Sequence, residues 1–158
     1  MSRATHTVFT AQLLEHFARG RALIEDYQRW LGIDLCFQNF ASELDQIASM
    51  YGPPSGALIL AQMDEKYVGC VGIRALEPQI AEMKRMYVPE AFRGLGIGRA
   101  LAEHSIAVAR NLGYKRMRLD TVPRLRAARS IYFKLGFVAI PAYRHNPDPE
   151  TLFLELEL

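Results

Sequence analysis

The N-terminal part of the chain carries apolar residues at the spacing of an amphipathic helix. Between residues 11 and 31 they recur every three or four positions, at Leu13, Leu14, Phe17, Leu23, Ile24, Tyr27 and Leu31. This period predicts a helix, which Gly32 is placed to end. An alternating segment at 5–9 predicts a short strand before it. A second helix is expected over 43–50 with Ser42 as its N-cap, after a loop or short extended piece at 33–40.

The pattern changes from helical to strand-like after residue 56. The stretch 52–56, Gly-Pro-Pro-Ser-Gly, interrupts regular structure and separates the helical part from a strand-rich middle. Strands are predicted at 57–63, 67–76 and 80–88. Links of only a few residues join them, so consecutive strands are expected to pair as antiparallel hairpins.

Helices and strands alternate in the second half of the chain. A helix is expected from Ile97 to Leu112, capped by Gly113 and followed by a strand at 116–121. This order predicts a right-handed parallel crossover between strands 80–88 and 116–121. The remaining predicted elements are a helix with Pro123 in its first turn that runs to Leu135, a strand at 137–140, a proline-rich loop at 141–150 and a strand at 151–158.

Composition points to one ordinary globular domain. The chain has 158 residues, of which 50% are hydrophobic and 23% charged. Neither the helical part nor the strand-rich part is expected to bury a core alone, so a single α+β domain over residues 1–158 is predicted. A formal net charge of +2 gives no reason to expect a nucleic-acid partner. Arginines cluster between Arg110 and Arg129. They are expected to form a solvated basic face, with the steering of an anionic cofactor as a secondary role.

The cysteine and histidine residues predict no disulfide and no metal site. Cys36 and Cys70 form neither a disulfide framework nor a Cys-x-x-Cys motif, and the four histidines are dispersed. The first residues lack the apolar stretch of a signal peptide, and no segment is long enough to span a membrane. A cytoplasmic protein with no membrane association is therefore expected.

A glycine-rich loop at the start of the helix expected from Ile97 is the strongest candidate for chemistry. Pro89 ends the preceding strand, and the loop then contains Arg93, Gly94, Leu95, Gly96, Ile97, Gly98 and Arg99. Glycines at a helix start let backbone N–H groups approach a ligand closely, and the helix dipole favours negative charge there. The two arginines add cationic donors. The pattern favours a pyrophosphate site over glycines that only permit tight packing.

Two motifs resemble those of a known family. The stretch Arg93-Gly94-Leu95-Gly96-Ile97-Gly98 is similar to the acyl-CoA pyrophosphate signature of the GNAT superfamily of N-acetyltransferases, Gln/Arg-x-x-Gly-x-Gly/Ala. Residues 128–137 resemble the family's second landmark, a helix ending in Tyr-x-x-x-Gly-Phe. The order of predicted elements is also similar, so the resemblance spans nearly the whole chain. Residues 82–88, 119–121 and 143–147 resemble a bacterial subgroup of acetyltransferases without an assigned substrate.

The resemblance implies a GNAT fold with acetyl-CoA as the acetyl donor. In that fold a mixed, mostly antiparallel sheet has helices on both faces, and residues 93–99 hold the pyrophosphate. The backbone of Met86, Tyr87 and Val88 is then expected to bind the acetyl carbonyl and the pantetheine, where strands 80–88 and 116–121 separate. One position departs from the pattern. Many members carry an Asn seven residues before the helix tyrosine, and Leu125 stands there in this chain.

Acetyl transfer to an amine needs a proton acceptor, because an amine like that of lysine has a pKa of about 10.4 and is charged at neutral pH. Glu82 is the candidate base, since it lies on the strand that leads to the glycine loop and the family places a strand carboxylate there. Its alternative role is an ion pair with Lys84 or Arg85 across the sheet.

Tyr132 is the candidate acid for the leaving thiolate. It shares a helix face with Leu125, Ala128 and Leu135, and a tyrosine in such an apolar stripe is ordinarily part of the core. The family pattern favours the acid role.

Two other function classes compete with the enzyme. One is a non-catalytic acyl-CoA-binding sensor that keeps the glycine loop; the presence of Glu82 and Tyr132 favours the enzyme. The other is a dinucleotide-dependent oxidoreductase, in which Asp120 would hold a ribose. The Gly-x-Gly-x-Gly spacing and the preceding antiparallel hairpins argue against it. The amine acceptor, a small molecule or a protein, is not identified by any motif, and a homodimer is a possible assembly.

Overall fold

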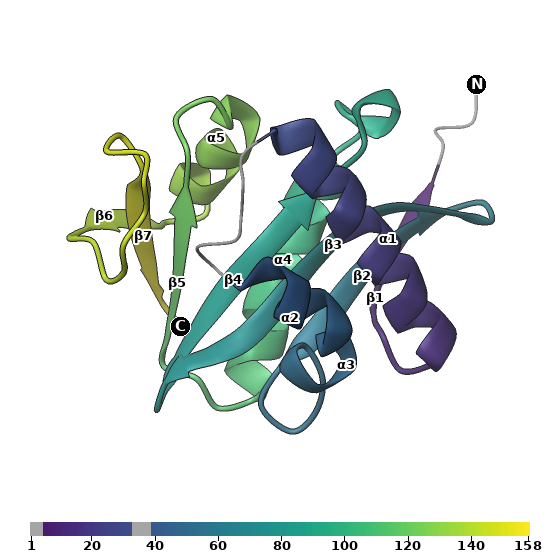
Figure 1. Ribbon diagram of the computed structural model, residues 1–158, viewed down its shortest axis with the longest axis horizontal. Coiled ribbons are helices and arrows are strands. Elements are labelled where there is room, and N and C mark those ends of the chain that lie inside the picture. The colour runs from purple at the N-terminus through teal and green to yellow at the C-terminus, as the bar shows by residue number, and fades with distance from the viewer. Residues whose placement is uncertain (1–4, 33–38) are drawn as a thin grey trace.

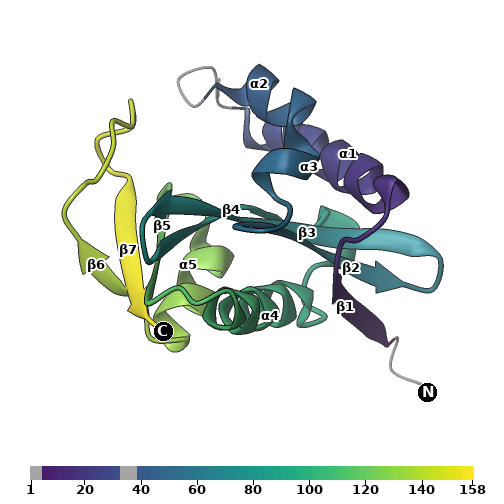
Figure 2. The same cartoon turned by 90° about the horizontal axis from the view of Figure 1, so that it is seen from below.

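The computed structural model describes residues 5–32 and 39–158. A seven-stranded sheet with the order β1-β2-β3-β4-β5-β7-β6 runs through the molecule. Helices α1, α2 and α3 cover one face of the sheet, and α4 and α5 cover the other (Figures 1 and 2). This confirms the α+β fold with helices on both faces.

The N-terminal elements follow the apolar periods, with one correction. Strand β1 (His6–Thr10) leads into α1 (Leu14–Leu31), which ends at Gly32 in the left-handed conformation, as predicted. The single helix expected over 43–50 is instead two short helices, α2 (Phe40–Asp45) and α3 (Ile47–Met50). Asn39 and not Ser42 stands at the N-cap, because Phe40 begins the first turn. Most of the piece expected at 33–40, including Cys36, lies outside the described residues.

The central hairpins form as the short links predict. Strands β2 (Ala57–Met63), β3 (Lys66–Glu77) and β4 (Ile80–Tyr87) pair as antiparallel neighbours. The β3–β4 register shifts near the end of β4, where Cys70 is opposite Tyr87 but Gly72 is opposite Lys84. Three steps along β4 therefore match two steps along β3, which defines a β-bulge at residues 85–86.

The predicted parallel crossover joins β4 to β5. After β4 the chain passes through a short 3-10 helix, η2 (Glu90–Phe92), into α4 (Ile97–Asn111) and then β5 (Arg116–Thr121). Strands β4 and β5 pair in parallel only from Ile80 opposite Arg116 to Glu82 opposite Arg118. Beyond that point no ladder joins them. The gap expected between these two strands is therefore present.

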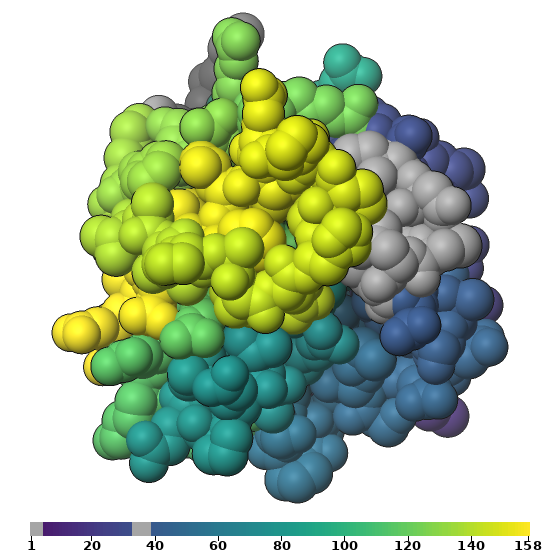
Figure 3. Space-filling model, turned by 60° about the vertical axis from the view of Figure 1, so that its left-hand side comes forward, coloured from purple at the N-terminus to yellow at the C-terminus, as the bar shows by residue number. Residues whose placement is uncertain are grey.

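The C-terminal elements complete the sheet beyond β5. Helix α5 (Arg126–Lys134) begins after Pro123, which therefore lies before the helix and not in its first turn as expected. Strand β6 (Val138–Ile140) forms the edge, and β7 (Leu152–Glu157) pairs with both β5 and β6 in antiparallel fashion. Figure 3 shows the loop between β6 and β7, in yellow-green, at the surface of this end of the molecule.

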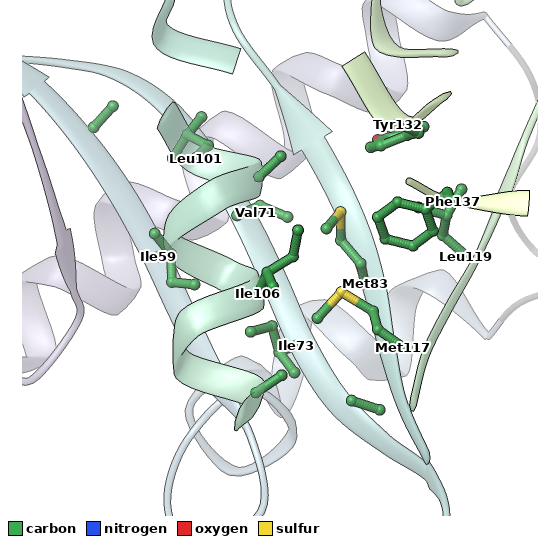
Figure 4. Packing of buried hydrophobic residues seen from close by; sticks show 14 of the residues in the cluster. Ile59, Val71, Ile73, Met83, Leu101, Ile106, Met117, Leu119, Tyr132 and Phe137 are labelled. Atoms are coloured by element: carbon green, nitrogen blue, oxygen red, sulfur yellow. The ribbon is translucent and has the colours of Figure 1, made fainter. Parts of the chain in front are cut away.

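Apolar side chains fill two layers, one on each sheet face. The larger cluster joins the sheet to α4 and α5, and Figure 4 shows Met83, Leu119, Tyr132 and Phe137 close together within it. The smaller cluster joins the sheet to α1 and α3 through residues such as Leu23, Ile24 and Tyr51. Successive residues of a strand point to opposite faces, so β4 contributes Met83 to the larger cluster and Tyr87 to the smaller one.

Candidate active site

A cavity of about 810 Å³ lies at the gap between β4 and β5. Its walls come from the C-terminal part of α1, the end of β4, the glycine loop, the end of β5, α5, and residues 146–148 of the loop between β6 and β7. Because the two strands are not paired here, the cavity reaches both faces of the sheet. Backbone groups that a ladder would occupy are available to a ligand.

The glycine loop forms one end of this cavity. Gly94 and Gly96 have φ values of +81° and +82°, and Gly96 is the N-cap of α4. A side chain at either position would be strained by this left-handed backbone, although a Cβ there would meet no other atom within 4 Å. At Gly98 a Cβ would lie 3.3 Å from Ile131 of α5. The loop is therefore an open backbone surface at the start of a 15-residue helix.

Most of the residues predicted to bind the cofactor line this cavity. They are Met86, Tyr87, Val88, Arg93, Gly94, Gly96, Ile97, Gly98 and Arg99. Leu95 is not part of the lining, and its side chain is 47% exposed. Leu125, which stands where many family members have Asn, also lines the cavity. The structure thus brings the predicted set together around one space, with Leu95 turned to the solvent.

Arginines and a tryptophan form the rim near the glycine loop. The Nε of Arg93 donates a hydrogen bond of 2.9 Å to the carbonyl oxygen of Val88. The guanidinium of Arg93 lies 4.3 Å from the centroid of the Trp30 ring, and that of Arg124 lies 5.8 Å from it. Arg99 is paired with Glu103 one turn along α4, at 2.8 Å. The rim is therefore cationic around an aromatic ring.

The bulge in β4 directs two basic residues to the face covered by α2. Arg85 has a φ of +61° and forms two hydrogen bonds with the Glu43 carboxylate of α2, at 2.8 and 2.9 Å. Lys84 is buried and lines the cavity. Burial, followed by the charge of Arg85, lowers the pKa of Lys84 to about 7. Lys84 therefore changes charge near neutral pH.

Glu82, the candidate base, is enclosed by cationic groups. Its side chain is fully buried, accepts a hydrogen bond of 2.9 Å from the Nε of Arg74, and forms an ion pair with Arg144. The hydroxyl of Tyr143 donates a further hydrogen bond of 2.9 Å. Burial opposes ionisation of Glu82, but the charges of Lys84, Arg144 and Arg74 outweigh it and lower the pKa of the carboxyl.

This environment bears on both interpretations of Glu82. The sequence predicts Lys84 or Arg85 as the ion-pair partner of Glu82. Lys84 is 4.0 Å away, at the limit of an ion pair, whereas the close contacts come from Arg74 and Arg144. Glu82 is not among the residues that line the cavity. Its role as a base stays a prediction, and a carboxylate held ionised by such partners is a weak proton acceptor.

Tyr132, the candidate acid, lies in the wall of the cavity on the α4–α5 side. Its side chain is 6% exposed, and its ring packs edge-on against Phe137 with centroids 5.7 Å apart (Figure 4). Burial raises the pKa of its hydroxyl well above 10. The hydroxyl therefore carries its proton at neutral pH. The ring serves the core and the hydroxyl is available to a ligand, so the two predicted roles of Tyr132 are compatible.

Sequence reasoning missed two polar residues at the end of β5. Asp120 and Thr121 both line the cavity, and the Oδ2 of Asp120 and the Oγ1 of Thr121 are buried without a hydrogen-bond partner among the described residues. The sequence pattern singles out Asp120 only as a ribose ligand. The position of Asp120 in the strand indicates its role. Asp120 directly follows the buried Leu119, so its side chain leaves the α4–α5 core and faces the other side of the sheet.

Within residues 5–32 and 39–158 there is no group of three or more His, Cys, Asp and Glu side chains able to hold a metal ion. No helix in this part of the chain is long and apolar enough to cross a membrane.

Comparison with known proteins points to one family. Residues 13–137 match the model of the acetyltransferase (GNAT) family. An uncharacterized N-acetyltransferase of Schizosaccharomyces pombe is 36% identical over 140 residues, which cover 87% of this chain and 86% of the relative.

Solved structures agree with this match at the level of the fold. A GNAT-family acetyltransferase of Staphylococcus aureus superimposes with a TM-score of 0.79 at 21% identity, over 97% of this chain and 99% of that one. A GNAT-family acetyltransferase of Elizabethkingia anophelis, solved with acetyl-CoA bound, has a TM-score of 0.64 at 20% identity, over 97% and 98% of the two chains.

Proposed function

The chain belongs to the acetyltransferase (GNAT) family, and we propose that it transfers an acetyl group from acetyl-CoA to a primary amine by direct attack on the thioester. The observation that carries this proposal is the cavity itself. A glycine loop at a helix N-terminus opens into a space of about 810 Å³, which continues through a gap between two strands to the opposite face of the sheet. Such a space can hold acetyl-CoA and the amine from opposite faces of the sheet, with their reacting groups at the gap between β4 and β5.

The glycine loop is the proposed site of the pyrophosphate. Backbone N–H groups at the start of α4 and the positive end of its dipole favour a phosphate there. Arg93 and Arg99 stand at the same end of the cavity and supply positive charge. The pantetheine arm would then run between β4 and β5, with the backbone of Met86, Tyr87 and Val88 as its hydrogen-bonding partners. Leu125 offers that arm an apolar contact where many family members offer an amide.

The thioester is proposed to lie at the gap between the strands. The carbonyl oxygen becomes negatively charged as the amine attacks, and backbone N–H groups at the β4 bulge are fixed donors that need no rearrangement to stabilise it. Tyr132 is proposed to protonate the departing thiolate, since its hydroxyl keeps a proton at neutral pH and faces the cavity from the α5 side. The amine would enter from the opposite face, between α1 and residues 146–148.

Binding and turnover measurements test the proposal. Calorimetry should show binding of acetyl-CoA in preference to NAD and ATP. A panel of primary amines, including amino acids, diamines, aryl-ethylamines and peptides with a free N-terminus or lysine, should then reveal release of CoA that depends on the amine. Stabilisation by NAD and not by CoA would overturn the proposal. Tight acetyl-CoA binding without turnover of any amine would favour the non-catalytic sensor.

A further inference from the structure

Asp120 differs from the two buried carboxylates of the described residues, because its half-buried side chain has no ion-pair partner among them. Glu43 is held by Arg85, and Glu82 by Arg74 and Arg144. The Oδ2 of Asp120 is buried and receives no hydrogen bond from the described part of the chain. A buried carboxylate oxygen without a partner is energetically unfavourable, and such a group commonly serves a ligand.

The position of Asp120 suits an incoming amine. It lies at the C-terminal end of β5, two residues beyond Arg118, where the pairing with β4 ends, and it lines the cavity at the gap. Leu119 points into the core beneath α4 and α5, so Asp120 faces the side of the sheet that α1 covers. This is the side from which the acceptor is proposed to enter, whereas Tyr132 reaches the cavity from the other side.

Hydroxyl groups of three tyrosines lie within electrostatic reach of Asp120. Burial raises the pKa values of Tyr27, Tyr132 and Tyr143, and the charge of Asp120 adds to the rise in all three. Tyr27 of α1 and Tyr132 of α5 line the cavity on its two sides, and Tyr143 lies on the loop between β6 and β7, so the carboxylate stands between these elements. Thr121, the next residue, also has a buried hydroxyl without a hydrogen-bond partner among the described residues, but it lies on the α4–α5 side with Leu119. The acceptor side of the gap thus holds an acidic group, with the Tyr27 hydroxyl within its electrostatic reach.

We propose that Asp120 binds the ammonium group of the acceptor and accepts the proton that the nitrogen must lose before it attacks the thioester. This inference rests on the acetyl transfer proposed above, and it assigns to Asp120 the role that the sequence predicted for Glu82. An ammonium ion supplies the positive charge and the N–H donors that the Asp120 carboxylate lacks. Glu82, already surrounded by donors, instead fixes the position of Tyr143 on the loop between β6 and β7.

The proton and electron balance of the step is complete without another reactant. The ammonium gives one proton to Asp120, which releases it to water. The nitrogen lone pair then forms the C–N bond, and the C–S bond breaks with its electron pair on sulfur. Tyr132 protonates that thiolate, and the second proton lost by the nitrogen returns to the Tyr132 oxygen through water. The products are the acetylated amine and CoA.

The variant Asp120→Asn tests the assignment, because it keeps the shape of the side chain and removes its charge and basicity. We expect an unchanged or higher melting temperature, since no partner of the carboxylate is left unpaired, and unchanged affinity for acetyl-CoA by calorimetry. Turnover of the most reactive alkylamine in the panel should fall by about 10²–10⁴-fold. Asp64→Asn, in the exposed turn between β2 and β3, is the matched control and should retain full turnover.

A second amine separates a base from a residue that only shapes the pocket. Methoxyamine is already neutral at pH 7.5 and needs no proton acceptor before attack, so the defect of Asp120→Asn should be much smaller with it than with the alkylamine. An equal defect with both amines, or near-normal turnover of the alkylamine, would overturn the assignment. A loss of turnover in folded Glu82→Gln protein that appears only with the alkylamine would also overturn the assignment, because Glu82 would then be the base. Asp120→Ser provides a second folded variant if the amide is not tolerated.

The two proposals fail in different ways. If the wild-type protein binds acetyl-CoA but acetylates no amine in the panel, the proposed function itself is wrong and the role of Asp120 falls with it. If the wild-type protein is active and Asp120→Asn is equally active, only the assignment of Asp120 is wrong.

Discussion

Two carboxylates near the gap between β4 and β5 have opposite surroundings. Glu82 is at the last position of β4 that pairs with β5, fully buried, and in contact with Arg74, Arg144 and Tyr143. Asp120 is at the open end of β5, lines the cavity, and has a buried oxygen without a partner. Residue type does not distinguish them, because both are acidic residues on strands beside the cavity.

The difference between them separates a structural charge from a reactive one. A carboxylate whose charge is compensated within the protein stabilises the fold and loses basicity, because every contact favours its ionised form. A carboxylate without compensation contributes nothing to stability but keeps its capacity to bind a cation or a proton. Active sites commonly hold groups of the second kind, at some expense of stability.

The largest expected effect is on stability and concerns Glu82. Glu82→Gln leaves Arg74 and Arg144 facing a neutral amide in a buried site, so the free energy of unfolding should fall by about 3–5 kcal/mol. Urea unfolding followed by circular dichroism measures this, with Asp120→Asn as the paired variant that should lose nothing. Equal losses in the two variants would abolish the distinction between the two carboxylates.

Tyr132→Phe extends the comparison to the α5 side of the gap. The ring and its packing on Phe137 are kept, so stability should change by only about 1 kcal/mol. Turnover should fall by roughly 10²-fold if the hydroxyl protonates the thiolate. An acyl donor with a more acidic leaving thiol needs no proton from the enzyme and should show a smaller defect. The same defect with both donors would assign Tyr132 to the core alone.

Gly96→Asp changes the end of the cavity where the cofactor is proposed to bind, and it should leave the surroundings of Glu82 and Asp120 unchanged. The new side chain strains a backbone with a φ of +82° and brings negative charge to the proposed phosphate site. Affinity for acetyl-CoA, measured by calorimetry on folded protein, should fall by about tenfold or more, which is about 1.4 kcal/mol. Gly113→Asp, at the other end of α4, is the control because its φ is also positive, at +92°. Equal affinities of the wild-type protein and Gly96→Asp would remove the phosphate assignment.

A last prediction, which needs no loss of activity, is a pH dependence due to Lys84, which helps to keep Glu82 ionised. Its pKa is about 7 in the folded protein and about 10.4 in an unfolded chain, so the unfolded state binds more protons between these values. The contribution of Lys84 to the free energy of unfolding should therefore rise with pH across this window, by at most about 1.4 kcal/mol per pH unit. The measure is the difference in unfolding free energy between the wild-type protein and Lys84→Met at pH 7 and pH 9. A constant difference would show that Lys84 titrates normally.

The sequence predicted the parts of the fold that depend on neighbours in the chain. Hairpins β2–β3 and β3–β4 followed from their short links, and the glycine loop followed from residues within one stretch of seven. The errors concern where two helices begin. Ser42 and Pro123 are good residues for a helix start, but Phe40 and Arg126 begin those helices, and helix ends are the part of an element that local sequence defines least well.

The state of the two carboxylates was decided only by the tertiary structure. Arg144 is 62 residues from Glu82 along the chain, and it reaches that carboxylate because β7 lies between β5 and β6 and brings the loop before it over the sheet. The Oδ2 of Asp120 has no hydrogen-bond partner among the described residues, and it stands two residues beyond the end of the β4–β5 ladder. The sequence by itself determined that acidic side chains would stand beside a glycine loop. Charge compensation acts through space and not along the chain, so only the folded protein decides which of them remains available for chemistry.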